Sequence, residues 1–367
     1  MQFQISRDAL LKPLSLLSGV VERRQTLPVF ANVLLVLKDK ELCLTGTDLE
    51  VELIGKTEVD QAYQSGEVTV PARKLLDIFK SLGEGAMVDV ALAENKLMIK
   101  SGRSRFTLAT LAASEFPSVE EEPDTFSLSV GQAELRKLLD NTSFAMAQQD
   151  VRYYLNGMLF EVGKSYLRLV STDGHRLAME TVNLSNELVE TQQQILPRKG
   201  VVELSRLLSD EGGEIMLTFG QNHIRAEVPE FTFTSKLVDG KFPDYNRVLP
   251  KGGNKSVIGD CQELRQAFAR ASILSNEKYR GVRVVLREGE MTILANNPDQ
   301  EEAEEVVAVE YSGEPIEMGF NVSYLIDVLS TLRSKKVRIT LSDPGSSALL
   351  EAEKGGDALY VVMPMRL

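Results

Sequence analysis

The chain repeats itself three times. Four landmarks recur in the same order at intervals of about 125 residues. They are a leucine within a helical stretch (Leu10, Leu135, Leu264), a turn residue after paired strands (Asp48, Asp173, Asn297), the residue before a second helix (Pro71, Pro197, Asn321) and a late strand that begins at Arg105, Phe231 and Ala358. This period is far longer than the roughly 20–50 residues of solenoid repeats, so each copy is predicted to be a domain.

Two polar segments that contain Pro or Gly separate the copies. They are Ser118–Thr125 and Leu249–Ser256, and their composition is typical of linkers. We therefore expect three domains, at residues 1–122, 126–250 and 254–367.

Each copy is predicted to contain the order β-α-β-β-β twice, which makes the fold class α+β. In the first copy, alternating residues predict strands and a 3.6-residue period predicts helices. The expected elements are strand Gln2–Ile5, helix Asp8–Val21, strands Asn32–Leu37, Glu41–Gly46 and Glu50–Ile54, then strand Glu67–Val70, helix Ala72–Leu82 and strands Met87–Leu92, Lys96–Lys100 and Arg105–Leu111. Pro13 lies inside the first helix, where we expect a kink.

The net charge of −12 by itself argues against binding to nucleic acid. The basic residues, however, gather in or beside the six predicted helices. They are Arg7, Lys12, Arg23, Arg24, Arg73, Lys74, Lys80, Arg136, Lys137, Arg198, Lys199, Arg206, Arg265, Arg270, Arg333, Lys335 and Lys336. Such cations decorate solvated helices in many proteins, but their repetition over six helices favours one basic surface, which would line the hole if the domains close into a ring.

The sequence contains no pattern typical of an enzyme. It has no phosphate-binding glycine loop, no HExxH and no GxSxG, and its two cysteines and two histidines do not form a metal-ligand spacing. The string Asp173–Arg176 could suggest acid–base chemistry, but the repeat favours a turn at Asp173. We expect no catalysis, no metal and no cofactor. With no signal peptide and no apolar run long enough to span a membrane, we expect a cytoplasmic protein without a membrane partner.

Long strings along all three copies resemble the bacterial DNA polymerase III beta subunit family. They include LTGTDLEVEL, VPARKLLDI, GRSRFTLATL, QQDVRYYLNGMLFE, STDGHRLA, FPDYNRVLP, NNPDQEEAEE, GFNVSYLIDVL and YVVMPMRL. The resemblance implies three clamp domains in a head-to-tail dimeric ring, with helices inside and sheets outside, around duplex DNA. The implied function is a sliding clamp that confers processivity on the replicative polymerase.

The resemblance also implies three sets of site residues. DNA contacts are expected at Arg24, Arg73, Gln149, Tyr153 and Tyr154; for the two tyrosines, packing at a domain edge is the alternative. A pocket for short peptides with Leu and Phe anchors is expected at Leu155, Thr172, Gly174, His175, Arg176, Leu177, Pro243, Arg247, Val248, Asn321, Tyr324, Ser347, Val361, Val362, Met363, Pro364, Met365 and Arg366. Arg176, Arg247 and Arg366 are expected at its rim, and Val361 can equally be a buried strand residue.

The third set is the dimer interface. Lys74, Arg103, Arg105, Phe106 and Leu108 are expected to meet Ile273, Leu274, Glu301, Glu302, Glu304 and Glu305 of a second chain. The implied partners are duplex DNA without sequence preference, a second copy, polymerase catalytic subunits, a clamp-loader ATPase and other proteins with clamp-binding peptides. The rival hypothesis is an acidic multi-domain interaction scaffold that does not encircle DNA.

Overall fold

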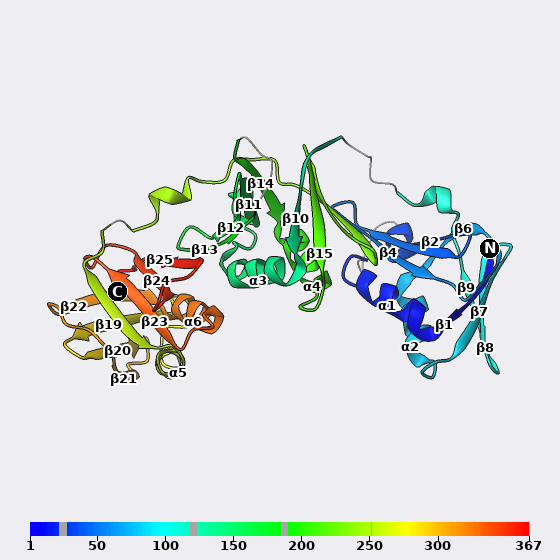
Figure 1. Cartoon of the computed structure of the whole chain (residues 1–367). Coiled ribbons are helices and arrows are strands. Elements are labelled where there is room, and N and C mark those ends of the chain that lie inside the picture. The colour runs from blue at the N-terminus through cyan, green and yellow to red at the C-terminus, as the bar shows by residue number, and fades with distance from the viewer. Residues whose placement is uncertain (22–27, 118–122, 185–189, 251, 367) are drawn as a thin grey trace. The chain divides into compact units, whose positions relative to one another are not determined.

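The computed structural model describes residues 1–21, 28–117, 123–184, 190–250 and 252–366 (Figure 1). The predicted β-α-β-β-β order is present twice in every copy. The first copy contains β1 (Gln2–Ser6), α1 (Arg7–Leu17), β2 (Asn32–Lys38), β3 (Glu41–Thr47), β4 (Val51–Glu58), β5 (Gln61–Gln64), β6 (Gly66–Pro71), α2 (Ala72–Ser81), β7 (Met87–Ala93), β8 (Lys96–Ser101) and β9 (Ser104–Ala109).

The second and third copies follow the same order. The second contains β10 (Asp124–Gly131), α3 (Gln132–Thr142), β11 (Gly157–Gly163), β12 (Tyr166–Thr172), β13 (Arg176–Asn183), β14 (Gln192–Pro197), α4 (Arg198–Leu207), β15 (Glu214–Gly220), β16 (His223–Val228) and β17 (Phe231–Lys236). The third contains β18 (Lys255–Asp260), α5 (Cys261–Ser272), β19 (Gly281–Arg287), β20 (Glu290–Asn296), β21 (Glu302–Ala308), β22 (Ile316–Asn321), α6 (Val322–Thr331), β23 (Lys336–Leu341), β24 (Ala348–Ala352) and β25 (Ala358–Val362).

Two elements of the first copy differ from the prediction. Helix α1 ends at Leu17 rather than Val21, because the amides of Val20 and Val21 both turn back to the Leu17 carbonyl. Strand β5 was not predicted. It is a polar strand at the edge of its sheet, paired with β1, and so it lacks the apolar alternation that marks a half-buried strand.

Helix α1 continues through Pro13. This residue is buried, and a Cβ atom placed on Gly55 of β4 would approach the Pro13 Cβ to 2.8 Å. A side chain at residue 55 would therefore push α1 away from the sheet. The kink that we expect at Pro13 stays a prediction.

The strands form four antiparallel sheets, two of which join neighbouring copies. The orders are β5-β1-β7-β8-β9, β10-β15-β16-β17-β4-β3-β2-β6, β14-β11-β12-β13-β25-β24-β23-β18 and β21-β20-β19-β22. The late strand β17 pairs with β4, with Phe233 opposite Leu53. The late strand β25 pairs with β13 in the same way, with Tyr360 opposite Ala178. Main-chain hydrogen bonds thus connect the copies as firmly as they connect strands within one copy.

The chain divides into two compact units. Unit 1 comprises Met1–Ala133 with Val202–Leu237, and unit 2 comprises Glu134–Val201 with Val238–Leu367. In unit 1, α1 and α2 pack on each other and contact strands of two different sheets. In unit 2, α5 and α6 do the same. Of the helices that the structure describes, none is both long and apolar enough to cross a membrane.

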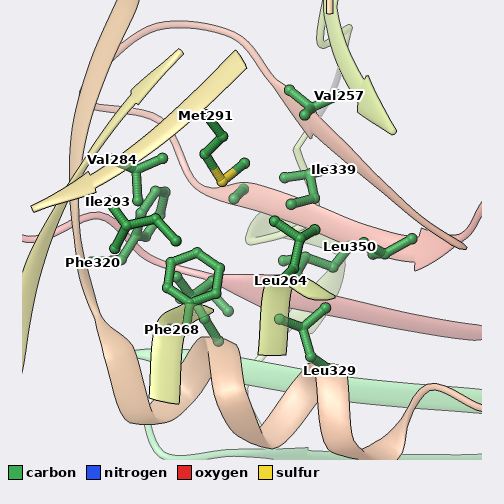
Figure 2. Packing of buried hydrophobic residues seen from close by; sticks show 14 of the residues in the cluster. Val257, Leu264, Phe268, Val284, Met291, Ile293, Phe320, Leu329, Ile339 and Leu350 are labelled. Carbon is green, nitrogen blue, oxygen red and sulfur yellow. The ribbon is translucent and has the colours of Figure 1, made fainter. Parts of the chain in front are cut away.

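The core of unit 2 shows how the helices are fixed to the sheets. Leu264 and Phe268 of α5 meet Leu329 of α6 beneath strand residues such as Ile293 and Leu350 (Figure 2). Asp260 begins α5 by accepting hydrogen bonds from the amides of residues 262 and 263, which satisfies two otherwise unpaired donors.

The second landmark of the repeat is an Asx-type turn in all three copies. The Asp48 carboxylate accepts from the amides of residues 50 and 51, and the Asp173 carboxylate accepts from those of residues 175 and 176. The Asn297 amide oxygen accepts from the amides of residues 299 and 301. Asp173 therefore has the turn role that the repeat predicts.

Truncating the α5 core contact tests this packing. Leu264→Ala should destabilise unit 2 by about 2–5 kcal/mol, because it leaves a cavity between α5 and the sheets. Arg265→Ala, on the exposed side of the same helix, should change stability by no more than about 0.5 kcal/mol. The urea midpoint measured by circular dichroism checks both, and equal midpoints for the two variants would contradict the assigned core.

Candidate functional site

The residues of the expected peptide pocket gather in unit 2, where four segments meet. These are the start of β13, the start of α6, the segment of residues 238–250 (hereafter the linking segment) and the chain after β25. The Met363 amide donates to the His175 carbonyl at 2.9 Å, and the Met365 amide donates to the Gly319 carbonyl at 2.9 Å. The C-terminal segment is therefore held between β13 and β22.

An open cavity of about 590 Å³ lies between the linking segment and the residues that join β23 to β24. It is lined by Arg247, Val248, Leu249, Pro250, Ser342, Gly345, Ser346 and Ser347. Arg247, Val248 and Ser347 are among the predicted pocket residues. Leu249, Pro250, Ser342 and Ser346 were missed, although the first two directly follow Val248 and the last precedes Ser347 in the chain.

The floor of this region is a separate apolar cluster. It contains Leu159, Val170, Leu177, Met179, Ile195, Phe242, Tyr245 and Val361, and Val248 packs against it. Val361 and Val362 are fully buried strand residues, opposite Leu177 and Arg176. Met363, Pro364 and Met365 follow the end of β25 and remain half-buried. The apolar surface open to a ligand therefore belongs to these three residues and the linking segment. Val361 lies in the cluster beneath it, whereas Val362 belongs to the core of unit 2 shown in Figure 2.

Arg176 is not free at the rim. Its side chain is 12% exposed, and its guanidinium pairs with Asp173 and Asp327. It also donates to the Phe144 carbonyl at 2.7 Å and lies 4.5 Å from the centre of the Tyr324 ring. Every nitrogen of the guanidinium is thus engaged within the chain, so Arg176 joins β13 to α6. Sequence could not show this, because Asp327 and Phe144 are distant in the chain.

The other two expected rim cations remain accessible. Arg247 is 86% exposed and its only close acid is Asp244, at 3.1 Å, among the residues that the structure describes. Arg366 is exposed as well. A salt bridge this exposed contributes little to stability, so Arg247 can exchange Asp244 for a ligand carboxylate.

The remaining expected pocket residues divide into supports and surface groups. Leu155 is buried, Asn321 caps α6 through a bond from the Ser323 amide, and the Thr172 hydroxyl holds the turn before β13. Gly174 has a φ of 88°, and a Cβ there would come within 3.0 Å of the Arg152 guanidinium. Tyr324 is half-buried beneath Arg176, whereas His175 and Pro243 are exposed.

The candidate DNA contacts lie in both units. Arg73 is on α2 of unit 1, 71% exposed, with Asp77 one turn away at 3.9 Å. Gln149, Tyr153 and Tyr154 are in unit 2, on the loop before β11. Tyr153 is 58% exposed, whereas Tyr154 packs against the apolar cluster. Domain-edge packing therefore describes Tyr154 better than Tyr153. Arg24 lies outside the described residues.

The loop that carries these tyrosines is stiff. The amide of Asp150 bonds to the Asn156 side chain at 2.9 Å, and the Asn156 side chain returns a bond to the Asp150 carbonyl at 2.9 Å. Hydrogen bonds from the Arg152 side chain and amide lower the pKa of Asp150 to about 2. The carboxylate is therefore ionised at neutral pH and keeps the Asp150–Arg152 pair formed.

The expected interface residues lie at two sheet edges. Arg103, Arg105, Phe106 and Leu108 are on or beside β9 in unit 1, and Glu301, Glu302 and Glu304 are on or beside β21 in unit 2. In the part of the chain that the structure describes, neither strand has a partner on its outer side. Lys74 is exposed on α2, Ile273 is 75% exposed after α5 with Leu274 half-buried beside it, and Glu305 is paired with Arg270 of its own chain.

The helical cations also divide into two groups. Lys12, Arg73, Lys74, Lys80, Arg265, Arg333 and Lys335 are exposed, and so is Lys137, although it pairs with the buried Glu180 carboxylate at 2.8 Å. Arg7, Arg206 and Arg270 instead make contacts within the chain. Arg7 donates to the Phe79 carbonyl, Arg206 donates to the Leu16 carbonyl and pairs with Glu203, and Arg270 pairs with Glu305. These three support the fold rather than a free basic surface. Among the described residues no group of three or more His, Cys, Asp or Glu side chains is placed to hold a metal.

Three family models match successive parts of the chain. They describe the DNA polymerase III beta subunit N-terminal domain over residues 1–120, the central domain over 129–244 and the C-terminal domain over 246–366. A beta sliding clamp of Pseudomonas putida is 60% identical over 367 residues, and one of Escherichia coli is 50% identical; each match covers all of both chains. The crystal structure of the DNA polymerase III subunit beta from Pseudomonas aeruginosa superposes with a TM-score of 0.98 at 60% identity, again over all of both chains.

Removing the Arg176 guanidinium tests its role between β13 and α6. Arg176→Ala leaves Asp327 and the Phe144 carbonyl without their partner, so unit 2 should lose about 2–4 kcal/mol of stability. Arg247→Ala removes an equally charged but exposed side chain and should change stability by about 0.5 kcal/mol or less. Denaturant midpoints measure both stability changes. An unchanged midpoint for Arg176→Ala would contradict the structural role of this arginine between β13 and α6.

Proposed function

Because the chain belongs to the DNA polymerase III beta subunit family, the bacterial sliding clamps, we propose that two copies join head to tail into a ring around duplex DNA. The chain is a DNA sliding clamp, a non-catalytic subunit that confers processivity on the polymerase. Its three clamp domains are assigned to residues 1–122, 126–250 and 254–367. The observation that carries the ring is the pattern of strand pairing between the copies.

Both junctions within the chain use the same register. Phe233 and Tyr360 occupy equivalent positions in their copies. The strand register from β15 to β17 leads to Phe233, and the register from β23 to β25 leads to Tyr360. The same steps from β7 lead to Phe106 on β9. Leu53 and Ala178, the residues opposite the first two aromatics, correspond to Ala303 on β21. The unpaired edges β9 and β21 thus carry the two halves of a third junction.

A second chain supplies the missing half. In the register of the other junctions, Phe106 of one copy lies opposite Ala303 of its partner. One step along the strands, Arg105 then lies opposite Glu304. Directly opposed charges of opposite sign stabilise a strand pair, and exposed Ile273 supplies apolar surface beside it. An edge of this kind invites pairing with another chain, and ring closure removes it.

DNA binding is assigned to Arg24, Arg73, Gln149, Tyr153 and Tyr154, supported by the exposed cations on the helices. Lys and Arg attract phosphates without reading bases, so no sequence preference is expected. Each direct phosphate contact adds about 0.9 to the dependence of log K on log salt, so a mobile clamp needs few of them.

The pocket of unit 2 is assigned to short peptides with Leu and Phe anchors. Support comes from the apolar surface of Met363, Pro364 and Met365, the adjoining cavity and the exposed cations Arg247 and Arg366. The proposed owners of such peptides are polymerase catalytic subunits, the clamp-loader ATPase and other replication and repair proteins. All of these act in the cytoplasm, where we place this protein.

Retention on DNA separates a ring from an ordinary binder. The chain, loaded by a clamp loader onto a nicked circular plasmid, should stay bound through gel filtration and be lost when the plasmid is cut to a linear form. Equal retention on both forms would indicate binding without encirclement. No retention on either form would favour an interaction scaffold.

The register between chains has its own test. Arg105→Glu and Glu304→Arg should each weaken the dimer about tenfold or more, because each places like charges opposite each other, and the double variant should recover most of the loss. Sedimentation equilibrium measures the dimer constant. Lys96→Glu, an exposed charge change on the neighbouring strand β8, serves as the control. A better recovery by Glu302→Arg than by Glu304→Arg would show that the register is wrong by two residues.

A further inference from the structure

A buried polar network fastens the linking segment to strands β11 and β12. Tyr245 of this segment and Glu161 of β11 are both buried, and the Tyr245 hydroxyl donates to the Glu161 carboxylate at 2.8 Å. Arg168 of β12 donates to the same hydroxyl at 2.9 Å and to the same carboxylate at 3.2 Å. The tyrosine hydroxyl is therefore fixed from two directions.

The rest of the network completes the hydrogen bonding of Glu161. Tyr166 donates to its first carboxylate oxygen at 3.0 Å, and Gln193 donates to the second at 2.7 Å. Burial raises the pKa of Tyr245 to about 12, so its hydroxyl keeps the proton that it donates. A network with these partners tolerates little movement of any member.

The repeat shows that this network belongs to the central copy alone. Glu161 and Arg168 face each other across β11 and β12. The equivalent cross-strand pair is Val36 and Cys43 in the first copy, and Val285 and Thr292 in the third. The same sheet therefore forms in two other copies without an ion pair at this place.

The comparison between copies indicates whether the Glu161–Arg168 ion pair is needed for folding. Burying an ion pair requires desolvation that its attraction only partly offsets, and apolar pairs of similar size often stabilise a fold as well. Since two sister domains use uncharged pairs, folding alone does not explain the charges. In the central copy this network fastens a segment that leads into the pocket.

We propose that Glu161, Arg168 and Tyr245 are positioning residues of the peptide pocket. They hold the linking segment in the path that presents Pro243, Arg247 and Val248 to a bound peptide. This inference rests on the proposed function of the pocket. None of the three needs to touch the peptide, because their effect passes through the segment.

The local geometry shows how the effect passes. Tyr245 lies two residues after Pro243 and two before Arg247, in a short 3₁₀ turn of residues 245–247. The Val248 amide donates to the Tyr245 carbonyl at 3.0 Å, which ties the cavity wall directly to the anchored residue. Upstream, the Val238 amide bonds to the Ile195 carbonyl at 2.8 Å. Between these two points, Phe242 and Tyr245 are the buried anchors of the segment.

Two tyrosines that bond to one carboxylate oxygen provide a matched experiment. Tyr245→Phe removes a hydroxyl from the linking segment, and Tyr166→Phe removes a hydroxyl from β12 that bonds to the same Glu161 oxygen. The probe is a fluorescent synthetic peptide whose apolar side chains are Leu and Phe, measured by fluorescence anisotropy with the full-length dimer. We expect about tenfold weaker peptide binding for Tyr245→Phe and less than a twofold change for Tyr166→Phe.

Further readouts distinguish positioning from general damage. Dimer mass and retention on nicked circular DNA should be unchanged in both variants. Glu161→Gln should also weaken peptide binding. The variant that combines Glu161→Gln with Tyr245→Phe should lose less affinity than the product of the two single losses, because both changes act through one contact.

The outcomes are separable. Equal peptide affinities for the two tyrosine variants and the unaltered chain would overturn the positioning role while leaving the pocket intact. A variant lacking residues 363–367 should lose the peptide. If the unaltered chain does not bind the peptide, or if this truncated variant still binds it, the proposed pocket fails and the positioning role fails with it.

Discussion

Antiparallel pairing between the late strand of one copy and the fourth strand of its neighbour is the constraint on which the rest depends. A sheet edge exposes unpaired amides and carbonyls. Proteins cover such an edge, protect it with charged residues or pair it with another strand. In this chain β17 pairs with β4 and β25 pairs with β13, so each copy uses its neighbour to complete an eight-stranded sheet. Among the described residues, two strands are left without such a partner. They are β9, the late strand of the first copy, and β21, which corresponds in the third copy to β4 and β13. The proposed ring uses between chains the same kind of strand pairing that joins the copies within one chain.

One folding unit supports different surfaces because the features that all three copies share and the features that differ between copies lie in different places. The turn at Asp48, Asp173 and Asn297 and the buried leucines of the first helices repeat in all copies. The Glu161–Arg168 pair and the segment Met363–Met365 occur once each. The proposed pocket lies where the second copy meets the third, since the turn with Gly174, the linking segment and the chain after β25 come together there. The first copy has Leu49 in the place of Gly174.

Much of the architecture was predictable from sequence because it depends on local pattern and on self-comparison. The helices and most strands follow apolar periodicity, and the repeat placed Asp173 in a turn. Strand β5 was missed because a polar edge strand has no such pattern. The contacts of Arg176 within the chain could not be predicted, because its partner Asp327 lies 151 residues away. The tyrosines of the loop before β11 were likewise indistinguishable by type, and only packing separates exposed Tyr153 from Tyr154. Family resemblance supplied the site residues themselves, which neither periodicity nor charge could identify.

The distribution of charge explains how an acidic chain can work on DNA. Arg7, Arg206 and Arg270 are committed to carbonyls and carboxylates within the chain, so they add nothing to a phosphate-binding surface. Other helical cations are exposed, such as Arg73, which lies 3.9 Å from Asp77 and is 71% exposed. Long flexible cations attract phosphates at any register along the duplex, because they select neither a base nor a fixed phosphate geometry. A ring does not require tight contacts to stay on DNA, since topology prevents its escape. Weak, interchangeable contacts then become an advantage, because each one that is broken during movement is replaced by an equivalent one.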